Sequence, residues 1–315
     1  MSGPITPGAG PDRRDEPRTW TRRRVLGYGL GGAVCAAVAG FELVDHGVLP
    51  GRDELDRLDG ACSVSSPDET LGPVGPSQSA SFFSKARNRT VGYTIAYPPG
   101  HRPGSVLPLV IALHGYLGNH ASALGAVTPA QALAERTGGL ALPPMALVTA
   151  DGGVGYWNAH PGDDPMGMLV DELIPICREL GLGRGHRAIG TVGISMGGYG
   201  SLLLAEKHPD LIAGAAAISP AIWTSYAQAH AANAGAFASA AAFAQDDVIT
   251  HAAALRATPV RVASGTDDPF HPGVEALVRA LPASAVVEIT KGCHDGGFFA
   301  SQRPAALAFV GRALA

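Results

Sequence analysis

The sequence predicts an α/β domain in which a largely parallel sheet is covered by helices on both faces. Two observations lead to this prediction. Along residues 80–315, short runs of consecutive apolar residues alternate with longer stretches of helical periodicity, a pattern typical of strands buried on both faces. The 315 residues are 46% hydrophobic and only 16% charged, so the chain has enough apolar material for one large core.

The order of the predicted elements follows from these runs. The expected strands are Thr90–Tyr97, Leu107–Leu113, Met145–Thr149, His186–Ile194, Gly214–Ile218, Val260–Ala263 and Ala285–Ile289. The expected helices are Thr128–Arg136, Gly167–Leu180, Met196–Lys207, Pro272–Ala280 and Gln302–Leu314. An antiparallel hairpin over Ala80–Tyr97 is expected to open the sheet. The Ala-rich segment, residues 221–251, breaks the alternation and predicts a small cap over the carboxyl ends of the strands, where open α/β sheets place their ligands.

The N-terminal residues carry an export pattern. Six Arg and three acidic residues in positions 1–24 precede an uncharged, Gly-interrupted apolar run, Val25–Phe41. Arg22 and Arg23 stand where a twin-arginine signal places its pair, which the export machinery reads. Residues 1–41 therefore predict a signal or an N-terminal anchor, and both cleavage and membrane attachment through residues 25–41 remain open. Residues 42–79 form a predicted linker, and we expect an exported protein.

Charge and cysteine content exclude several classes of function. The 23 basic and 27 acidic residues form no dense cationic stretch in the domain, which argues against nucleic-acid binding. The sequence has no C-x-x-C or H-E-x-x-H motif, so neither a metal nor another cofactor is expected. Beyond the N-terminal run, Cys62, Cys177 and Cys293 allow one disulfide, and we expect it between Cys62 and Cys293 because both flank loops.

A nucleophile is predicted at Ser195. The segment Gly193–Gly197 fits G-x-S-x-G, with a predicted strand before it and a predicted helix after it. This strand, tight turn and helix push a serine hydroxyl out of the sheet, and the two glycines leave room for the strained turn. The alternative interpretation is a structural Gly-Ser turn.

A serine hydroxyl needs a base that takes its proton and an acid that orients the base, in the chain order Ser, acid, His. Asp268 is the predicted acid, in a loop that follows a predicted strand, and Asp267 is the alternative. His294 is the predicted base, in a Gly-bounded loop before the last helix. His271 competes for that role, but it lies too close to Asp268 in sequence to be oriented by it.

An oxyanion hole requires two backbone donors aimed at the developing negative charge. The amide of Met196 follows the nucleophile, and the amide of Tyr116 lies in the loop after the predicted strand Leu107–Leu113. His114, in the same loop, is interpreted as a structural residue and not as a second base.

The four motifs together resemble the α/β-hydrolase superfamily and, within it, the putative-esterase group that includes esterase D and the mycobacterial mycolyltransferase antigens. The resemblance covers about residues 80–315, and the export pattern is similar to that of actinobacterial members. It rests on the oxyanion segment Leu113–Tyr116, the nucleophile turn Gly193–Gly197, the acid loop Gly265–Asp268 and the base loop Gly292–His294.

The resemblance also implies that Trp157 and His160 contribute to the wall of the substrate pocket, with plain packing as the alternative for Trp157. It implies a serine carboxylic-ester hydrolase that acts on a small-molecule or lipid ester. Acyl transfer to envelope lipids or sugars would use the same residues, and a non-catalytic secreted binding protein is a third hypothesis. The Ala-rich segment is expected to govern acyl chain length.

Overall fold

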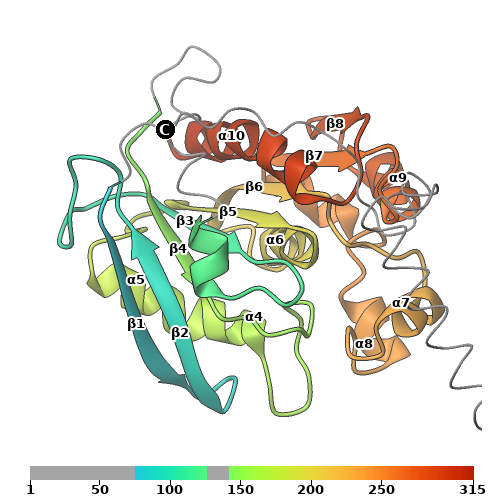
Figure 1. Cartoon of the computed structure of the whole chain (residues 1–315), viewed down its shortest axis with the longest axis horizontal. Coiled ribbons are helices and arrows are strands. Elements are labelled where there is room, and N and C mark those ends of the chain that lie inside the picture. Colours follow the sequence, from blue (N-terminus) through green and yellow to red (C-terminus); the bar gives the residue numbers. More distant parts are fainter. Residues whose placement is uncertain (1–74, 126–141) are drawn as a thin grey trace, which may run out of the picture. The chain divides into compact units, whose positions relative to one another are not determined.

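The computed structural model describes residues 75–125 and 142–315, which form one eight-stranded sheet with the order β1-β2-β4-β3-β5-β6-β7-β8 (Figure 1). The hairpin β1–β2 pairs antiparallel with β4, and every later neighbour is parallel. The predicted α/β architecture and its opening hairpin are therefore confirmed. The strands are β1 Ser77–Ser84, β2 Arg89–Ala96, β3 Leu109–Leu113, β4 Ala146–Ala150, β5 Ile189–Ile194, β6 Ile212–Ile218, β7 Val260–Gly265 and β8 Val286–Thr290.

Strands β3 and β5 begin two and three residues later than predicted, for local reasons. Strand β3 starts after Pro108, which has no amide hydrogen for a sheet ladder. Strand β5 starts after Arg187, whose φ of 53° turns the chain before the strand begins. In both cases only the later part of the predicted segment pairs with neighbouring strands.

The helices are α4 Pro165–Gly167, η1 Met168–Leu173, α5 Ile174–Glu179, α6 Met196–Lys207, α7 Tyr226–Ala232, α8 Ala240–Gln245, η2 Ala252–Ala257, α9 His271–Ala280 and α10 Gly296–Ala313; residues 120–125 are also helical. Helix α6 has the predicted bounds. The predicted helix Gly167–Leu180 is one helical stretch whose middle turn, η1, is wound as a π-helix next to Pro175. Thr128–Arg136 lies outside the described residues.

Helix α10 begins six residues before its predicted start. Asp295 caps its first turn, with the carboxylate accepting a hydrogen bond from the Phe298 amide at 2.8 Å. The helix signal is weak there because the helix opens with Gly296 and Gly297, two poor helix formers. Burial of Phe298 and Leu307 against the sheet offsets these unfavourable residues.

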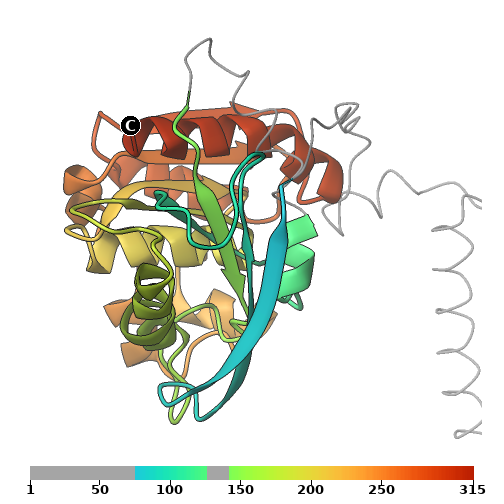
Figure 2. The same cartoon turned by 90° about the vertical axis from the view of Figure 1, so that its left-hand side faces the viewer.

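The sheet separates two apolar cores. One contains the inner faces of α5, α6 and α9, and the other contains α10. Figure 2 shows α10 on one side of the sheet and α5 and α6 on the other. Helix α10 lies directly on β5 and β6, because these strands present glycines to it: a Cβ on Gly190 would lie 2.2 Å from the Val310 side chain, and one on Gly214 would lie 2.7 Å from Ala313.

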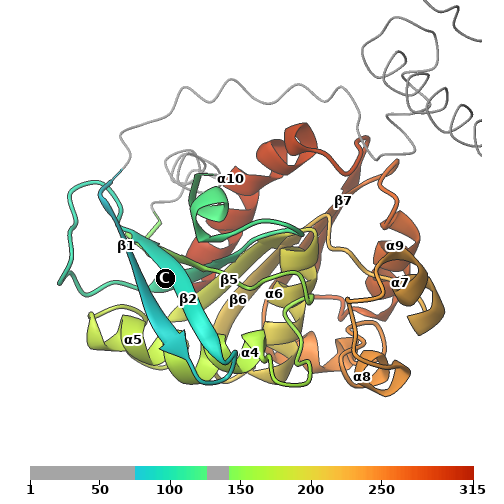
Figure 3. The ribbon, with the colours of Figure 1, turned by 60° about the horizontal axis from the view of Figure 1, so that its bottom comes forward.

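The Ala-rich segment forms α7 and α8 and packs on the α6 side of the sheet. Figure 3 shows α7 and α8 next to each other beyond α6. The Phe237 ring lies 5.8 Å from that of Tyr199 in α6, and the Tyr199 hydroxyl donates to the Asp246 carbonyl at 2.8 Å. The start of the segment lies at the carboxyl edge, where the Trp223 ring is 5.4 Å from that of Phe270.

The predicted signal or anchor and residues 42–74 of the predicted linker lie outside the described residues, so export and membrane attachment stay predictions. No helix in the described part of the chain is long and apolar enough to cross a bilayer. Cys177 is a free thiol in α5, and burial raises its pKa to about 12. Cys293 is disulfide-bonded, whereas its predicted partner, Cys62, is not among the described residues.

The close packing of α10 on the sheet makes a first prediction. Gly190→Ala should lower the free energy of unfolding by about 1–3 kcal/mol, because the new methyl group overlaps the buried Val310 side chain. Chemical denaturation measures the change. Gly296→Ala is the matched control, since a Cβ there meets no atom within 4 Å and should raise stability by about 0.4–1 kcal/mol. Equal effects at the two positions would contradict the packing argument.

Candidate active site

Ser195 occupies a strained turn between β5 and α6. Its φ of 57° is unusual for a residue with a side chain. The Ser195 amide donates to the Ile218 carbonyl at 2.9 Å, and the Ser195 carbonyl accepts from the Ala221 amide at 3.1 Å. A Cβ on Gly193 would lie 2.0 Å from the Gly197 carbonyl oxygen, and a Cβ on Gly197 would lie 2.1 Å from that of Leu113. Both glycines of the motif are therefore required by close backbone contact.

Three side chains from three loops form one hydrogen-bonded chain at the carboxyl edge of the sheet. The Ser195 hydroxyl lies 2.9 Å from Nε2 of His294, and Nδ1 of His294 lies 2.9 Å from a carboxylate oxygen of Asp268. Because the carboxylate accepts, Nδ1 carries the proton and Nε2 is left to accept from the serine. The Asp268 side chain is fully buried, and its other oxygen accepts from the Phe270 amide at 2.8 Å.

The acid loop and the base loop are fastened to each other. The Asp267 amide donates to the Gly292 carbonyl at 2.9 Å, and a Cβ on Gly265 would lie 2.0 Å from the same oxygen. The rings of Phe270 and Phe299 each lie 5.0 Å from the His294 imidazole. Phe270, in the loop after β7, and Phe299, in α10, therefore both pack against the histidine, which lies in reach of the serine.

The two alternative residues lie elsewhere. The Asp267 side chain is exposed and accepts a hydrogen bond from the Thr266 hydroxyl at 3.1 Å. Nε2 of His271 lies 3.5 Å from Glu275, one turn along α9. Neither Asp267 nor His271 is hydrogen-bonded to the Ser195–His294 pair.

The loop after β3 lies beside Ser195, and His114 holds it in place. The Gly152 amide donates to Nε2 of His114 at 2.9 Å, while Nδ1 lies 2.8 Å from the Gly115 carbonyl and therefore donates to it. Burial lowers the pKa of His114, so the ring stays neutral and satisfies both contacts. Within the described residues, the amides of Tyr116 and Met196 donate no hydrogen bond, which leaves both available to a substrate oxygen.

Trp157 and His160 do not line the cavity beside Ser195. Trp157 is fully buried, and its indole N–H donates to the His114 carbonyl at 3.3 Å, so the packing alternative describes it correctly. Through this hydrogen bond, Trp157 supports the loop after β3. Nε2 of His160 lies 2.8 Å from the Gly155 carbonyl, within its own loop. The expected contribution of these two residues to the pocket wall is therefore wrong: a sequence motif gives their position along the chain, not the direction of the side chains.

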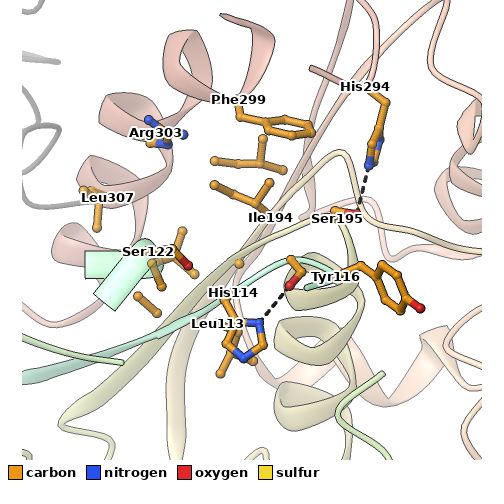
Figure 4. A pocket seen from close by; sticks show the side chains of 16 residues that line it. Leu113, His114, Tyr116, Ser122, Ile194, Ser195, His294, Phe299, Arg303 and Leu307 are labelled. Atoms are coloured by element: carbon orange, nitrogen blue, oxygen red, sulfur yellow. Dashed lines mark hydrogen bonds between the residues drawn. The ribbon is translucent and has the colours of Figure 1, made fainter. Parts of the chain in front are cut away.

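A cavity of about 360 Å³ opens beside Ser195 and His294 and runs between the sheet and α10 (Figure 4). The α10 residues Phe299, Arg303 and Leu307 line it, and the sequence did not indicate them as site residues. The only sequence signal was their position a few residues after His294. No residue of the Ala-rich segment is among the described residues that line this cavity, so the structure does not support the expectation that this segment governs chain length.

The mostly parallel sheet and the Ser195–His294–Asp268 chain define a serine hydrolase of the α/β-hydrolase fold. The family model described as "Putative esterase" matches residues 84–290, more than half of the chain, and the chain belongs to this family. It is therefore an esterase, an enzyme that hydrolyses carboxylic esters. No curated protein matches the chain significantly in sequence.

Solved structures share the fold at low sequence identity. A ferulic acid esterase superposes with a TM-score of 0.66 and 19% identity, over 77% of this chain and 100% of the other. An S-formylglutathione hydrolase from Agrobacterium tumefaciens gives 0.62 and 15%, over 78% and 99%. MPT51 of Mycobacterium tuberculosis gives 0.57 and 18%, over 76% and 100%. These likenesses agree with the predicted superfamily.

The contacts of His114 make a second prediction. His114→Ala should lower kcat by about 100-fold, because the loop that carries Tyr116 loses both ring contacts and small displacements at a reacting centre are costly. Ester hydrolysis measured with separate kcat and KM tests this. His160→Ala is the matched control, and its kcat should change less than twofold since the ring is hydrogen-bonded within its own loop, to the Gly155 carbonyl. A similar loss in both variants would show that His114 has no special role.

Proposed function

We propose that this esterase works through a covalent acyl-enzyme on Ser195. The observation that carries the proposal is the hydrogen-bonded chain from Ser195 through His294 to Asp268, with 2.9 Å at each step. Within hydrogen-bond reach, a histidine can take the serine proton as the oxygen attacks. The half-buried serine also lines the cavity, so an ester carbonyl can approach it.

In the first step, Ser195 Oγ forms a bond to the ester carbonyl carbon while its proton passes to Nε2 of His294. The carbonyl electron pair moves onto the oxygen. The buried Asp268 carboxylate, next to Nδ1, stabilises the imidazolium that forms. The intermediate then collapses: the bond to the alcohol oxygen breaks, and the imidazolium returns its proton to that oxygen as the alcohol leaves.

The negative oxygen of the intermediate needs donors fixed in advance. The amides of Tyr116 and Met196 are proposed for this, since they come from the two loops that flank Ser195 and donate to no other described group. In the second step, water gives a proton to Nε2 of His294 as its oxygen bonds to the acyl carbon. The bond between the acyl carbon and Ser195 Oγ then breaks, the imidazolium returns the proton to Oγ, and the acid is released. No group outside the chain and its substrates is required for this sequence of proton transfers.

The proposal is tested first at the serine. Ser195→Ala should reduce hydrolysis of p-nitrophenyl acetate by about 10⁶-fold, the loss expected when a nucleophile that acts as a unit with its base is removed. A fluorophosphonate probe should label the unaltered chain at Ser195 and leave the variant unlabelled, as peptide mass spectrometry can show. An unlabelled wild-type serine, or turnover unchanged in the variant, would overturn the acyl-enzyme.

The two adjacent aspartates provide a matched pair for the acid. Asp268→Asn should lower kcat by about 10⁴-fold, because an amide in place of the carboxylate favours the wrong tautomer of His294. Asp267→Asn should leave kcat within a factor of about two, because the Asp267 side chain is exposed and contacts only Thr266. Thermal melting checks that both variants fold, and the reverse ranking would assign the acid to Asp267.

A further inference from the structure

The cavity beside Ser195 occupies space that a close-packed core would fill. It lies on the α10 face of the sheet, where Ala112 of β3 and Val192 and Ile194 of β5 face Leu307 of α10. Protein interiors contain few voids larger than a water molecule, and a volume of about 360 Å³ falls within the range of ligand sites. Such a space next to a nucleophile is suited to part of a substrate.

The cavity is long in one direction. From Val192 to Ser195, three residues of extended chain span roughly 10 Å, and from Phe299 to Leu307, eight helical residues span about 12 Å. Both segments line the cavity from the carboxyl edge, where Ser195 and His294 are hydrogen-bonded, into the space between the sheet and α10. Figure 4 shows Leu307 and Arg303 at one end of the cavity and Ser195 at the other.

We propose that this cavity binds an aliphatic acyl chain of the substrate ester, so that the enzyme prefers medium-chain esters over acetyl esters. The inference rests on the acyl-enzyme proposed above and adds a substrate class to it. The acyl carbon bonded to Ser195 would lie at the mouth, and the chain would extend toward Leu307. Alkyl groups from β3, β5 and α10 supply most of the surface that the chain would contact.

The alcohol portion of the ester has a different exit. The Tyr116 side chain, half-exposed, points away from Leu307 on the far side of Ser195 (Figure 4). An alcohol leaving from that side would reach solvent directly, whereas an acyl chain in the cavity would not. Away from the mouth, where Tyr116 and His294 lie, Phe299 is the aromatic side chain among the described lining residues, and it packs edge-on to His294. An alkyl chain would therefore meet mostly aliphatic surface beyond the mouth.

The unaltered enzyme provides the first test. With p-nitrophenyl esters from acetate to dodecanoate, kcat/KM should rise about fourfold for each added methylene until the cavity is full, and then level off or fall. A feruloyl ester should be a poorer substrate than octanoate. A profile that falls from acetate onward, or a preference for the feruloyl ester, would overturn the aliphatic pocket.

Filling the cavity from two sides provides the second test. Ala112→Leu and Leu307→Trp should each lower the ratio of octanoyl to acetyl kcat/KM at least tenfold, because each adds atoms to the space that the chain would occupy. Phe243→Ala, in α8 of the Ala-rich segment, is the control and should leave the ratio unchanged. Ratios unchanged in the first two variants, or lowered by Phe243→Ala, would contradict the proposal.

Melting temperature gives a readout that does not depend on activity. Ala112→Leu should melt at or above the wild-type temperature, since added methyl groups fill a void, whereas overpacking of a closed core would lower it. A lowered melting temperature would show that the space is not open. The two proposals fail in different ways: an unlabelled Ser195 overturns the acyl-enzyme, while a labelled serine with a flat chain-length profile overturns only the pocket.

Discussion

The strained turn at Ser195 is the constraint on which the rest of the site depends. A left-handed φ at a serine costs on the order of 1–3 kcal/mol, and it persists only where the surroundings hold it. Here the backbone of β6 and of the residues after it binds the Ser195 amide and carbonyl. Gly193 and Gly197 let the chain pass within contact distance of itself and of β3. The turn therefore fixes the hydroxyl at the sheet edge before any substrate arrives.

Close backbone contacts also position the other catalytic candidates. Gly265 lies against Gly292, and this contact brings the Asp268 and His294 loops together from two neighbouring strands. His114 has the corresponding role for the loop after β3, and the Trp157 indole is hydrogen-bonded to the same loop. Contacts from groups outside the proposed chemistry thus hold the site in place, which is the arrangement that preorganised catalysis requires.

The two faces of the sheet are packed differently. On the α6 side, aromatic rings from Tyr199, Trp223 and Phe237 pack the Ala-rich segment into a continuous core. On the α10 side, the helix contacts the sheet closely at Gly190, whereas an elongated space lies between β3, β5 and the helix next to the nucleophile. The cavity that reaches Ser195 among the described residues lies on the α10 face, so the acyl specificity would be decided by α10 and not by the Ala-rich segment.

The sequence by itself determined the fold class and pointed to Ser195, Asp268 and His294, because strand periodicity, glycine spacing and the order of loops along the chain are local properties. It also favoured Asp268 over Asp267, although only the structure shows which carboxylate is buried. What the tertiary structure alone decided is direction: Trp157 points into the core, and Leu307 faces the cavity. The direction of a side chain depends on contacts between segments far apart in sequence, and no local pattern records them.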